Sequence, residues 1–224
     1  MLTLVTPTGC RPAAWALCER WMARQTYAGP VRWIVVDDGE QAQPVSFRRD
    51  DWQVEVIRPQ PFWRPGDNTQ ARNFRSALAR VGDDARVAVI EDDDYYAPGW
   101  LQRVVDELET AELIGQGWNR YYHAKTGAIR INGNDTHASL CASAFRSDAL
   151  ALFRRQCDRG PRLLDVPMWK HAHSRRVFND SLVIGIKGMP GRAGIAGGHE
   201  MTTDQPFDLR EWIGADAEAY AQFR

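Results

Sequence analysis

The chain has 224 residues, 44% of them hydrophobic and 25% charged, with a formal net charge of −1 at pH 7. These values fit one globular domain and exclude both a disordered chain and a protein with a strong overall field of either sign. The cations are almost all arginine, because only Lys125, Lys170 and Lys187 are lysines. Arginine binds phosphates through a planar fork of donors, so this bias reflects either codon usage in a GC-rich genome or a phosphate-rich ligand.

The cysteines and the first residues indicate a cytoplasmic protein without a stable membrane association. The four cysteines form no C-x-x-C pair and lack zinc-ligand spacing, so we expect reduced thiols; they are Cys10, Cys18, Cys141 and Cys157. No stretch approaches the roughly 20 apolar residues that span a bilayer. The sequence begins directly with the apolar run Leu2-Thr3-Leu4-Val5 rather than with a signal peptide.

Strands and helices alternate through the first half of the chain. The apolar spacing predicts strands at 2–6, 31–36, 52–57 and 86–90, and helices at 11–25, 69–81 and 98–108. The continuous apolar run 31–36 is typical of a strand that is buried on both faces. Such an alternation predicts an α/β fold with a mostly parallel sheet and right-handed crossovers.

Polar clusters follow three of the predicted strands at the point where each strand ends. They are Thr6-Pro7-Thr8, Asp37-Asp38-Gly39 and Glu91-Asp92-Asp93-Asp94. Ligands of open α/β sheets bind beyond the carboxyl ends of the strands. We therefore expect all three clusters to line one crevice.

The second half of the chain is more irregular. The pattern predicts a hairpin of 116–122 with 128–132, helices at 147–156 and 165–173, one long strand at 177–186 and a glycine-rich loop at 187–199. Neither an internal repeat nor a low-complexity linker divides the chain. We therefore expect a single domain over residues 1–224.

The acidic cluster 91–94 is a candidate metal site. Adjacent carboxylates repel each other, and a bound Mg²⁺ or Mn²⁺ offsets this repulsion while leaving coordination sites for phosphates. A solvated turn is the alternative, because aspartate also favours turns. The position of the cluster directly after an apolar strand favours the metal.

Four segments, in the same order, resemble family 2 glycosyltransferases of the GT-A type. Ile90–Leu101 resembles the metal-binding DXD region, and Val5–Pro12 is similar to the first strand and nucleotide loop. Val35–Gly39 and Gln70–Asn73 are similar to the V-D-D-G and A-R-N segments. The resemblance implies a Rossmann-like sheet flanked by helices, with a nucleotide-sugar-binding half at 1–105 and an irregular acceptor-side half at 106–224.

The resemblance also implies the ligands and the residues that bind them. The donor would be a UDP-sugar and the cofactor Mn²⁺ or Mg²⁺. The expected nucleotide contacts are Thr6, Thr8, Arg11, Asp37, Asp38, Arg72 and Asp92, with Arg192 on the diphosphate. Asp93 and His199 are the expected metal ligands, the latter because a long glycine-rich loop is usually functional. The chain departs from the family pattern at Glu91, the first position of D-x-D-D, and it lacks a Q-x-x-R-W acceptor motif.

Asp165 is the candidate general base. The resemblance implies a base at the start of a helix in the second half, and Asp165 opens the predicted helix at 165–173. It would remove the proton of an acceptor hydroxyl that attacks the anomeric carbon with inversion. The alternative is a helix N-cap, where aspartate is common. Asp135 and His137 are weaker candidates for the same role.

Segments that mix arginine with aromatic residues suggest a nucleic acid as the acceptor. The segments are 60–65 and 118–122, and the further arginines are Arg154, Arg155, Arg159, Arg162, Arg175 and Arg176. Rings stack on bases and arginine binds phosphates. The overall pattern, including I-K-G-M-P-G-R…G-G-H at 186–199, is similar to that of small phage glycosyltransferases that modify DNA. This resemblance implies 5-hydroxymethylcytosine or 5-hydroxymethyluracil as the acceptor and the host cytoplasm as the location.

Three alternatives remain open at this point. The first is a glycosyltransferase that acts on a saccharide, because exposed aromatic residues also stack on sugars. The second is a sugar nucleotidyltransferase, although Thr6-Pro7-Thr8-Gly9-Cys10-Arg11 is a poor match to the glycine-rich loop that such an enzyme needs. The third is a non-catalytic module that binds a nucleotide sugar or DNA, which has little need for the acidic cluster.

Overall fold

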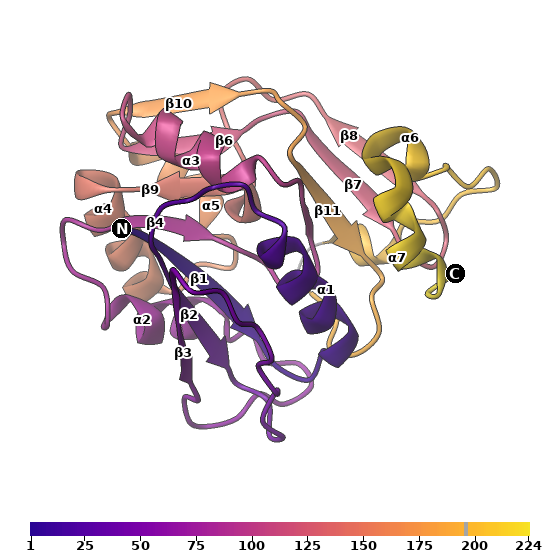
Figure 1. The fold of residues 1–224 in the computed structure, drawn as a ribbon, viewed down its shortest axis with the longest axis horizontal. Coiled ribbons are helices and arrows are strands. Elements are labelled where there is room, and N and C mark those ends of the chain that lie inside the picture. Colours follow the sequence, from indigo (N-terminus) through magenta and orange to yellow (C-terminus); the bar gives the residue numbers. More distant parts are fainter. Residues whose placement is uncertain (195–196) are drawn as a thin grey trace.

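The computed structural model describes residues 1–194 and 197–224 and shows a seven-stranded central sheet (Figure 1). In spatial order its strands are β3 (Trp52–Ile57), β2 (Val31–Asp37), β1 (Leu2–Thr8), β4 (Arg86–Val89), β9 (Ser143–Phe145), β6 (Leu113–Gln116) and β10 (Arg175–Phe178). Only β9 runs antiparallel to its neighbours, β4 and β6. The predicted α/β fold with a mostly parallel sheet is therefore confirmed.

The two faces of the central sheet carry separate hydrophobic cores. Successive strand residues point to opposite faces, so Leu4 and Trp33 lie in one core while Val5 and Ile34 lie in the other. The first core is covered by α1 (Pro12–Ala23) and α3 (Trp100–Leu108), and the second by α2 (Gln70–Leu78), α4 (Ser147–Arg159) and α5 (Asp165–His171). Burial on both faces explains the continuous apolar run of β2.

A second, smaller sheet packs beside the first core and was not expected. Its strand order is β5 (Tyr95–Tyr96), β11 (Val183–Lys187), β7 (Asn119–His123) and β8 (Ile129–Asn132). The expected hairpin is present as β7 and β8. The segment expected to begin this hairpin is divided at Gly117-Trp118, where Trp118 has a φ of 44°, so Gln116 belongs to β6.

The prediction of one long strand at 177–186 is wrong, because this segment contributes to two strands, β10 and β11, in different sheets. The turn-forming run Asn179-Asp180-Ser181 interrupts it, and Ser181 has a φ of 52°. The buried side chain of Gln116 holds this break. Its Oε1 accepts a hydrogen bond of 2.9 Å from the Val183 N–H, and its Nε2 donates one of 2.8 Å to the Val183 carbonyl.

The last residues of the chain pack against α1. Here α6 (Arg210–Ile213), the 3-10 turn Gly214–Ala217 and α7 (Glu218–Ala221) follow one another. The buried Trp21 indole donates a hydrogen bond of 2.9 Å to the Tyr220 hydroxyl. Two further 3-10 turns cover Leu140–Ala142 and Gly197–Glu200. Within the described ranges, no helix combines the length and the apolar character needed to cross a membrane.

Candidate functional site

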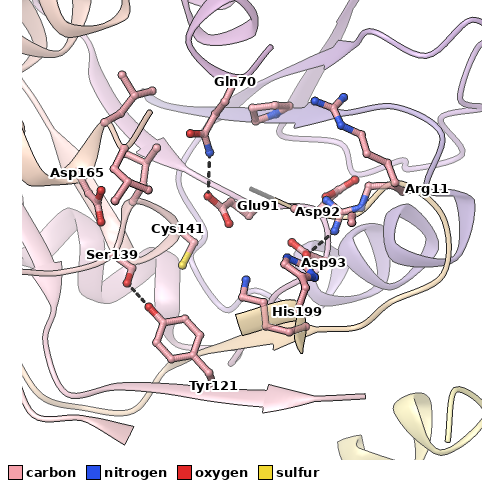
Figure 2. A pocket seen from close by; sticks show the side chains of 18 of the residues that line it. Arg11, Gln70, Glu91, Asp92, Asp93, Tyr121, Ser139, Cys141, Asp165 and His199 are labelled. Atoms are coloured by element: carbon pink, nitrogen blue, oxygen red, sulfur yellow. Dashed lines mark hydrogen bonds and ion pairs between the residues drawn. The ribbon is translucent and has the colours of Figure 1, made fainter. Parts of the chain in front are cut away.

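A cavity of about 340 Å³ lies at the carboxyl ends of β1 and β4. Thr8 enters it from the end of β1 and Glu91, Asp92 and Asp93 from the residues after β4, while Lys187 enters from the end of β11. Figure 2 shows Arg11, Asp92, Asp93 and His199 at one end, Asp165, Ser139 and Tyr121 at the other, and Glu91 between them. Two of the three polar strand ends therefore line one crevice, whereas the third, Asp37-Asp38-Gly39, does not line it.

Arg11 binds two carboxylates of the acidic cluster at once. One terminal nitrogen of Arg11 donates to Asp92 Oδ1 at 2.6 Å, and the other contacts Asp93 Oδ2. The hydroxyl of Thr8 donates to the second oxygen of Asp92 at 2.7 Å. Three of the residues expected to contact the nucleotide, Thr8, Arg11 and Asp92, thus form one network with the expected metal ligand Asp93.

Burial sets the protonation of the acidic cluster. It raises the pKa of Glu91 to about 8, with a further contribution from Asp94, and it raises the pKa of Asp92 to about 6. Burial alone would also raise the pKa of Asp93, but the positive charges of Arg11 and Lys187 hold it below its usual value. Asp93 is therefore the carboxylate that is most firmly ionised at neutral pH.

Lys187 neutralises part of the negative charge of the acidic cluster at Asp94, and the sequence analysis did not identify it as a site residue. Its ammonium lies 3.6 Å from Asp94 Oδ1, which also accepts a hydrogen bond of 2.8 Å from the Ile186 N–H. Asp94, Glu91 and Cys141 bring three possible metal-ligand atoms within 4.8 Å of one another, but Lys187 already supplies a cation there. Its position at the end of an apolar strand, in a chain with only three lysines, could have identified Lys187 from the sequence.

The donor set of Asp93 and His199 fits a hard divalent cation. Both line the cavity and lie next to each other in Figure 2. Burial lowers the pKa of His199 to about 4, and the charges of Lys187 and Arg11 act in the same direction. A neutral imidazole and an ionised carboxylate are the protonation states that metal coordination requires. The carbonyl oxygen of His199 lies 3.0 Å from Nε2 of the buried His123, which holds this segment in place.

Asp38 lies behind the cavity wall and connects several loops. Its Oδ1 accepts a hydrogen bond of 2.7 Å from Arg192, and its Oδ2 accepts bonds of 3.1 Å from Arg72 and 2.8 Å from Asn73. The Thr69 hydroxyl donates to the same oxygen. Of these residues, Arg192 and Asn73 line the cavity, whereas Asp38 and Arg72 do not.

Asp37 also binds loops rather than the cavity. Its carboxylate accepts hydrogen bonds of 3.0 Å from the Gly39 N–H, 2.8 Å from the Gln43 N–H and 3.2 Å from Arg58. Arg72 in turn donates a bond of 2.6 Å to the Pro61 carbonyl. The second polar strand end thus positions neighbouring loops in this structure.

The glycine-rich segment lies directly against the loop after β1. The Arg192 N–H donates to the Cys10 carbonyl at 3.3 Å. Gly191 has a φ of +97°, and a Cβ there would lie 2.3 Å from the same carbonyl oxygen, so only glycine fits. Arg192 also lies over the Trp63 ring at 4.7 Å. Residues 195 and 196 of the predicted loop lie outside the described residues.

Thr6 does not reach the cavity. Its side chain is buried in the first core, and its hydroxyl accepts a hydrogen bond of 2.9 Å from the Trp33 indole. The structure therefore assigns Thr6 a contact in the core, whereas Thr8, on the same strand, points into the cavity.

Asp165 lies at the other end of the cavity and forms a pair with His137. Asp165 Oδ2 is 3.2 Å from His137 Nε2, and the imidazole stacks on the Trp169 ring at 6.2 Å. Asp135 instead accepts a hydrogen bond of 2.9 Å from the exposed Trp118 indole. Of the two weaker candidates, only His137 therefore contacts Asp165.

Several arginines that suggested a nucleic acid are bound within the protein. Arg120 lies over the Trp212 ring at 5.4 Å, and Arg176 forms an ion pair of 2.8 Å with Glu107. Arg154 pairs with Asp83, and Arg175 donates to the Trp169 carbonyl. One further arginine, Arg130 on β8, lines the cavity. The arginine-rich surface is thus smaller than the sequence implied.

Comparison with known proteins identifies similar sequences. The sequence model of glycosyl transferase family 2 matches residues 15–159. The uncharacterized glycosyltransferase YwdF of Bacillus subtilis (strain 168) is 29% identical over 102 residues, which are 44% of this chain and 35% of that protein.

Solved structures share the fold at low sequence identity. S. aureus TarS has a TM-score of 0.60 at 12% identity, covering 83% of this chain and 36% of that chain. A shorter TarS structure in complex with UDP-GlcNAc has a TM-score of 0.59 at 13% identity and covers 100% of this chain and 71% of that one. The mannosyltransferase PcManGT of Pyrobaculum calidifontis, in complex with GDP-Man and Mn²⁺, has a TM-score of 0.55 at 14% identity over 98% of this chain and 69% of that one. The chain thus spans about a third of the length of YwdF and of the longer TarS chain.

The position of Thr6 leads to a first prediction. Thr6→Val should lower the free energy of unfolding by about 1–3 kcal/mol, because the buried Trp33 N–H loses its acceptor. Thr6→Ser, which keeps the hydroxyl, should stay closer to the wild type, and UDP affinity should be unchanged in both. Urea unfolding and calorimetric titration with UDP measure these quantities. Loss of UDP affinity at wild-type stability would instead make Thr6 a nucleotide contact.

Proposed function

The chain belongs to glycosyl transferase family 2, and from this premise we propose that it transfers a sugar from UDP to an acceptor hydroxyl with inversion. The observation that carries the proposal is a single cavity with Asp92, Asp93 and Arg11 at one end and Asp165 at the other. Membership of this family argues against the sugar nucleotidyltransferase and the non-catalytic module.

The Arg11 end of the cavity is the proposed donor site. Arg11, Lys187 and Arg192 all line the cavity and offer cationic donors to a diphosphate. Asp92 is the proposed ribose contact. Asp38 and Arg72 lie behind the cavity wall, so we propose that they act on the base by positioning Arg192 and the neighbouring loop. The UDP-GlcNAc complex of TarS supports a UDP-sugar as the donor.

Asp93 and His199 are the proposed metal ligands. A Mn²⁺ or Mg²⁺ ion held there would neutralise the charge that develops on the departing diphosphate. The Mn²⁺ in the PcManGT complex supports this assignment. Asp93 lies at the donor end in the turn that follows β4, and His199 approaches from the turn Gly197–Glu200.

The Asp165 end is the proposed acceptor site. The acceptor hydroxyl oxygen forms a bond to the anomeric carbon while Asp165 takes its proton and the bond to UDP breaks. His137, 3.2 Å away, orients the Asp165 carboxylate. Because the base and the leaving group lie at opposite ends of the cavity, the attack comes from the side opposite the diphosphate.

The proposed acceptor is 5-hydroxymethylcytosine or 5-hydroxymethyluracil in DNA. Its primary alcohol could reach Asp165 if the base is turned out of the duplex into the cavity. Arg130 lines the cavity, and Arg155 and Arg159 are exposed on α4, which packs beside α5. Trp118 is 49% exposed and offers a stacking surface. Such a surface also stacks on sugars, so a saccharide is the alternative acceptor.

The metal site gives the second prediction. Asp93→Ala should abolish turnover and remove the effect of Mn²⁺ on UDP affinity, because the ion loses its carboxylate ligand. His199→Ala should weaken the apparent metal affinity more than it lowers the maximal rate at saturating Mn²⁺. Asp84→Ala, at an exposed position distant from the cavity, is the control. Near-normal activity of Asp93→Ala would refute the metal site.

The base gives the third prediction. Asp165→Asn keeps the shape of the side chain but cannot take a proton, so we expect kcat to fall about 10²–10⁴-fold with UDP affinity unchanged. Asp148→Asn is a matched control, since Asp148 also stands in the first turn of a helix but is exposed to solvent. A parallel loss of UDP affinity and rate would show that Asp165 is structural.

The acceptor gives the fourth prediction. Enzyme, Mn²⁺ and a panel of UDP-sugars are incubated with DNA that contains 5-hydroxymethylcytosine or 5-hydroxymethyluracil, with unmodified DNA, and with a simple saccharide. Nucleoside digestion and mass spectrometry should detect a hexose on the hydroxymethylated base only. Phosphate contacts should make this activity fall steeply with salt. Transfer to the saccharide alone would reject the DNA acceptor and leave the glycosyltransferase proposal intact.

A further inference from the structure

Arg11 occupies the oxygens that a metal and a ribose would use. Its two terminal nitrogens contact Asp92 Oδ1, at 2.6 Å, and Asp93 Oδ2. Thr8 takes the remaining oxygen of Asp92 at 2.7 Å. The Arg11 side chain is 11% exposed, so little water competes for these contacts. A divalent cation on Asp93 would therefore have to share or displace a buried, charge-assisted contact.

The contact with the two aspartates does not satisfy all of the donors of Arg11. Its buried Nε has no hydrogen-bond partner among the described residues. A buried donor without a partner is unfavourable, and a diphosphate at the same end of the cavity would offer several anionic oxygens to the same guanidinium. Arg11 thus has a second set of acceptors as soon as a nucleotide arrives.

The backbone around Arg11 is held, so the side chain is the part that can change its partners. The Cys10 carbonyl accepts a hydrogen bond of 3.3 Å from Arg192 N–H, and the Arg11 carbonyl accepts one of 3.0 Å from the Trp15 N–H. Lys187 is not expected to exchange its carboxylate partner for a diphosphate, because it pairs with Asp94, which does not line the cavity.

We propose that Arg11 holds the place of the divalent cation on Asp93 and of the ribose on Asp92, and moves to the diphosphate when the nucleotide binds. Metal binding then depends on the nucleotide, since only the nucleotide draws the guanidinium away from Asp93. This inference rests on the proposed function and adds an order of assembly to it. The coupling is reciprocal: the factor by which UDP tightens Mn²⁺ binding equals the factor by which Mn²⁺ tightens UDP binding.

The test compares Mn²⁺ binding with and without UDP. Mn²⁺ affinity without nucleotide is measured by the loss of the free-ion signal in electron paramagnetic resonance, and UDP affinity with and without Mn²⁺ by calorimetry. The proteins are the wild type, Arg11→Gln, Arg11→Lys, and Arg20→Gln as a charge-matched control on the exposed face of α1. These readouts do not depend on turnover.

We expect Arg11→Gln to bind Mn²⁺ without UDP at least about 10-fold more tightly than the wild type. The factor by which UDP tightens Mn²⁺ binding should be smaller in this variant by the same amount. Arg11→Lys, which keeps the charge but lacks the fork, should lie between them. Arg20→Gln should behave as the wild type. If Arg11→Gln does not fold, a structure of the wild type with UDP and Mn²⁺ tests the proposal instead. In that structure Arg11 should no longer contact Asp93.

Three results would overturn the proposal. One is a wild type that binds Mn²⁺ equally well with and without UDP. Another is an Arg11→Gln variant whose Mn²⁺ affinity rises by the same factor with and without UDP, which is an effect of charge alone. The third is an Arg11–Asp93 contact retained in the ternary complex. Each of these leaves sugar transfer intact, whereas a wild type that binds neither UDP nor Mn²⁺ would remove the proposed function and this inference together.

Discussion

The burial of Asp92, Asp93 and Asp94, next to the half-buried Glu91 that follows β4, is the constraint on which the site depends. Buried carboxylates are costly unless they are paired and hydrogen-bonded. Arg11 meets this requirement from the start of α1, just after β1, and Lys187 from the end of β11, so the cluster ties the central sheet to the second sheet. Two cations do not balance four carboxylates, and the raised pKa of Glu91, to about 8, is a consequence of burial beside this excess of negative charge.

Asp38 organises the surroundings of this cluster. Arg72 from α2, Arg192 from the glycine-rich segment and the Thr69 hydroxyl all donate to its two oxygens. Residues from both halves of the chain therefore meet on one buried carboxylate, and the wall of the donor end is held by charge-assisted contacts. Such contacts position Arg192 without placing Asp38 itself in the cavity, which spacing along the sequence could not reveal.

Sequence patterns predicted the parts of the fold in which local composition and burial agree. The strand expected at 52–57 is β3, and the helix expected at 69–81 contains α2, because each carries a clear apolar period. The three residues of β9 are too few to show a period, and the division between β10 and β11 depends on a turn that Gln116 holds from a distant strand. Within the site, Asp93, His199 and Asp165 do share one cavity, while their roles stay predictions. The pairing of Lys187 with Asp94 is a long-range contact that needs the fold.

The short strand β9 fixes how the chain can be divided. It lies between β4 and β6 and pairs with both, so residues 143–145 from the second half complete the sheet begun by the first. A fragment ending near residue 105 would leave β4 with an open edge of unpaired backbone groups and would expose the apolar residues beneath α4 and α5. The donor-side half is thus a segment of sequence rather than a separable folding unit.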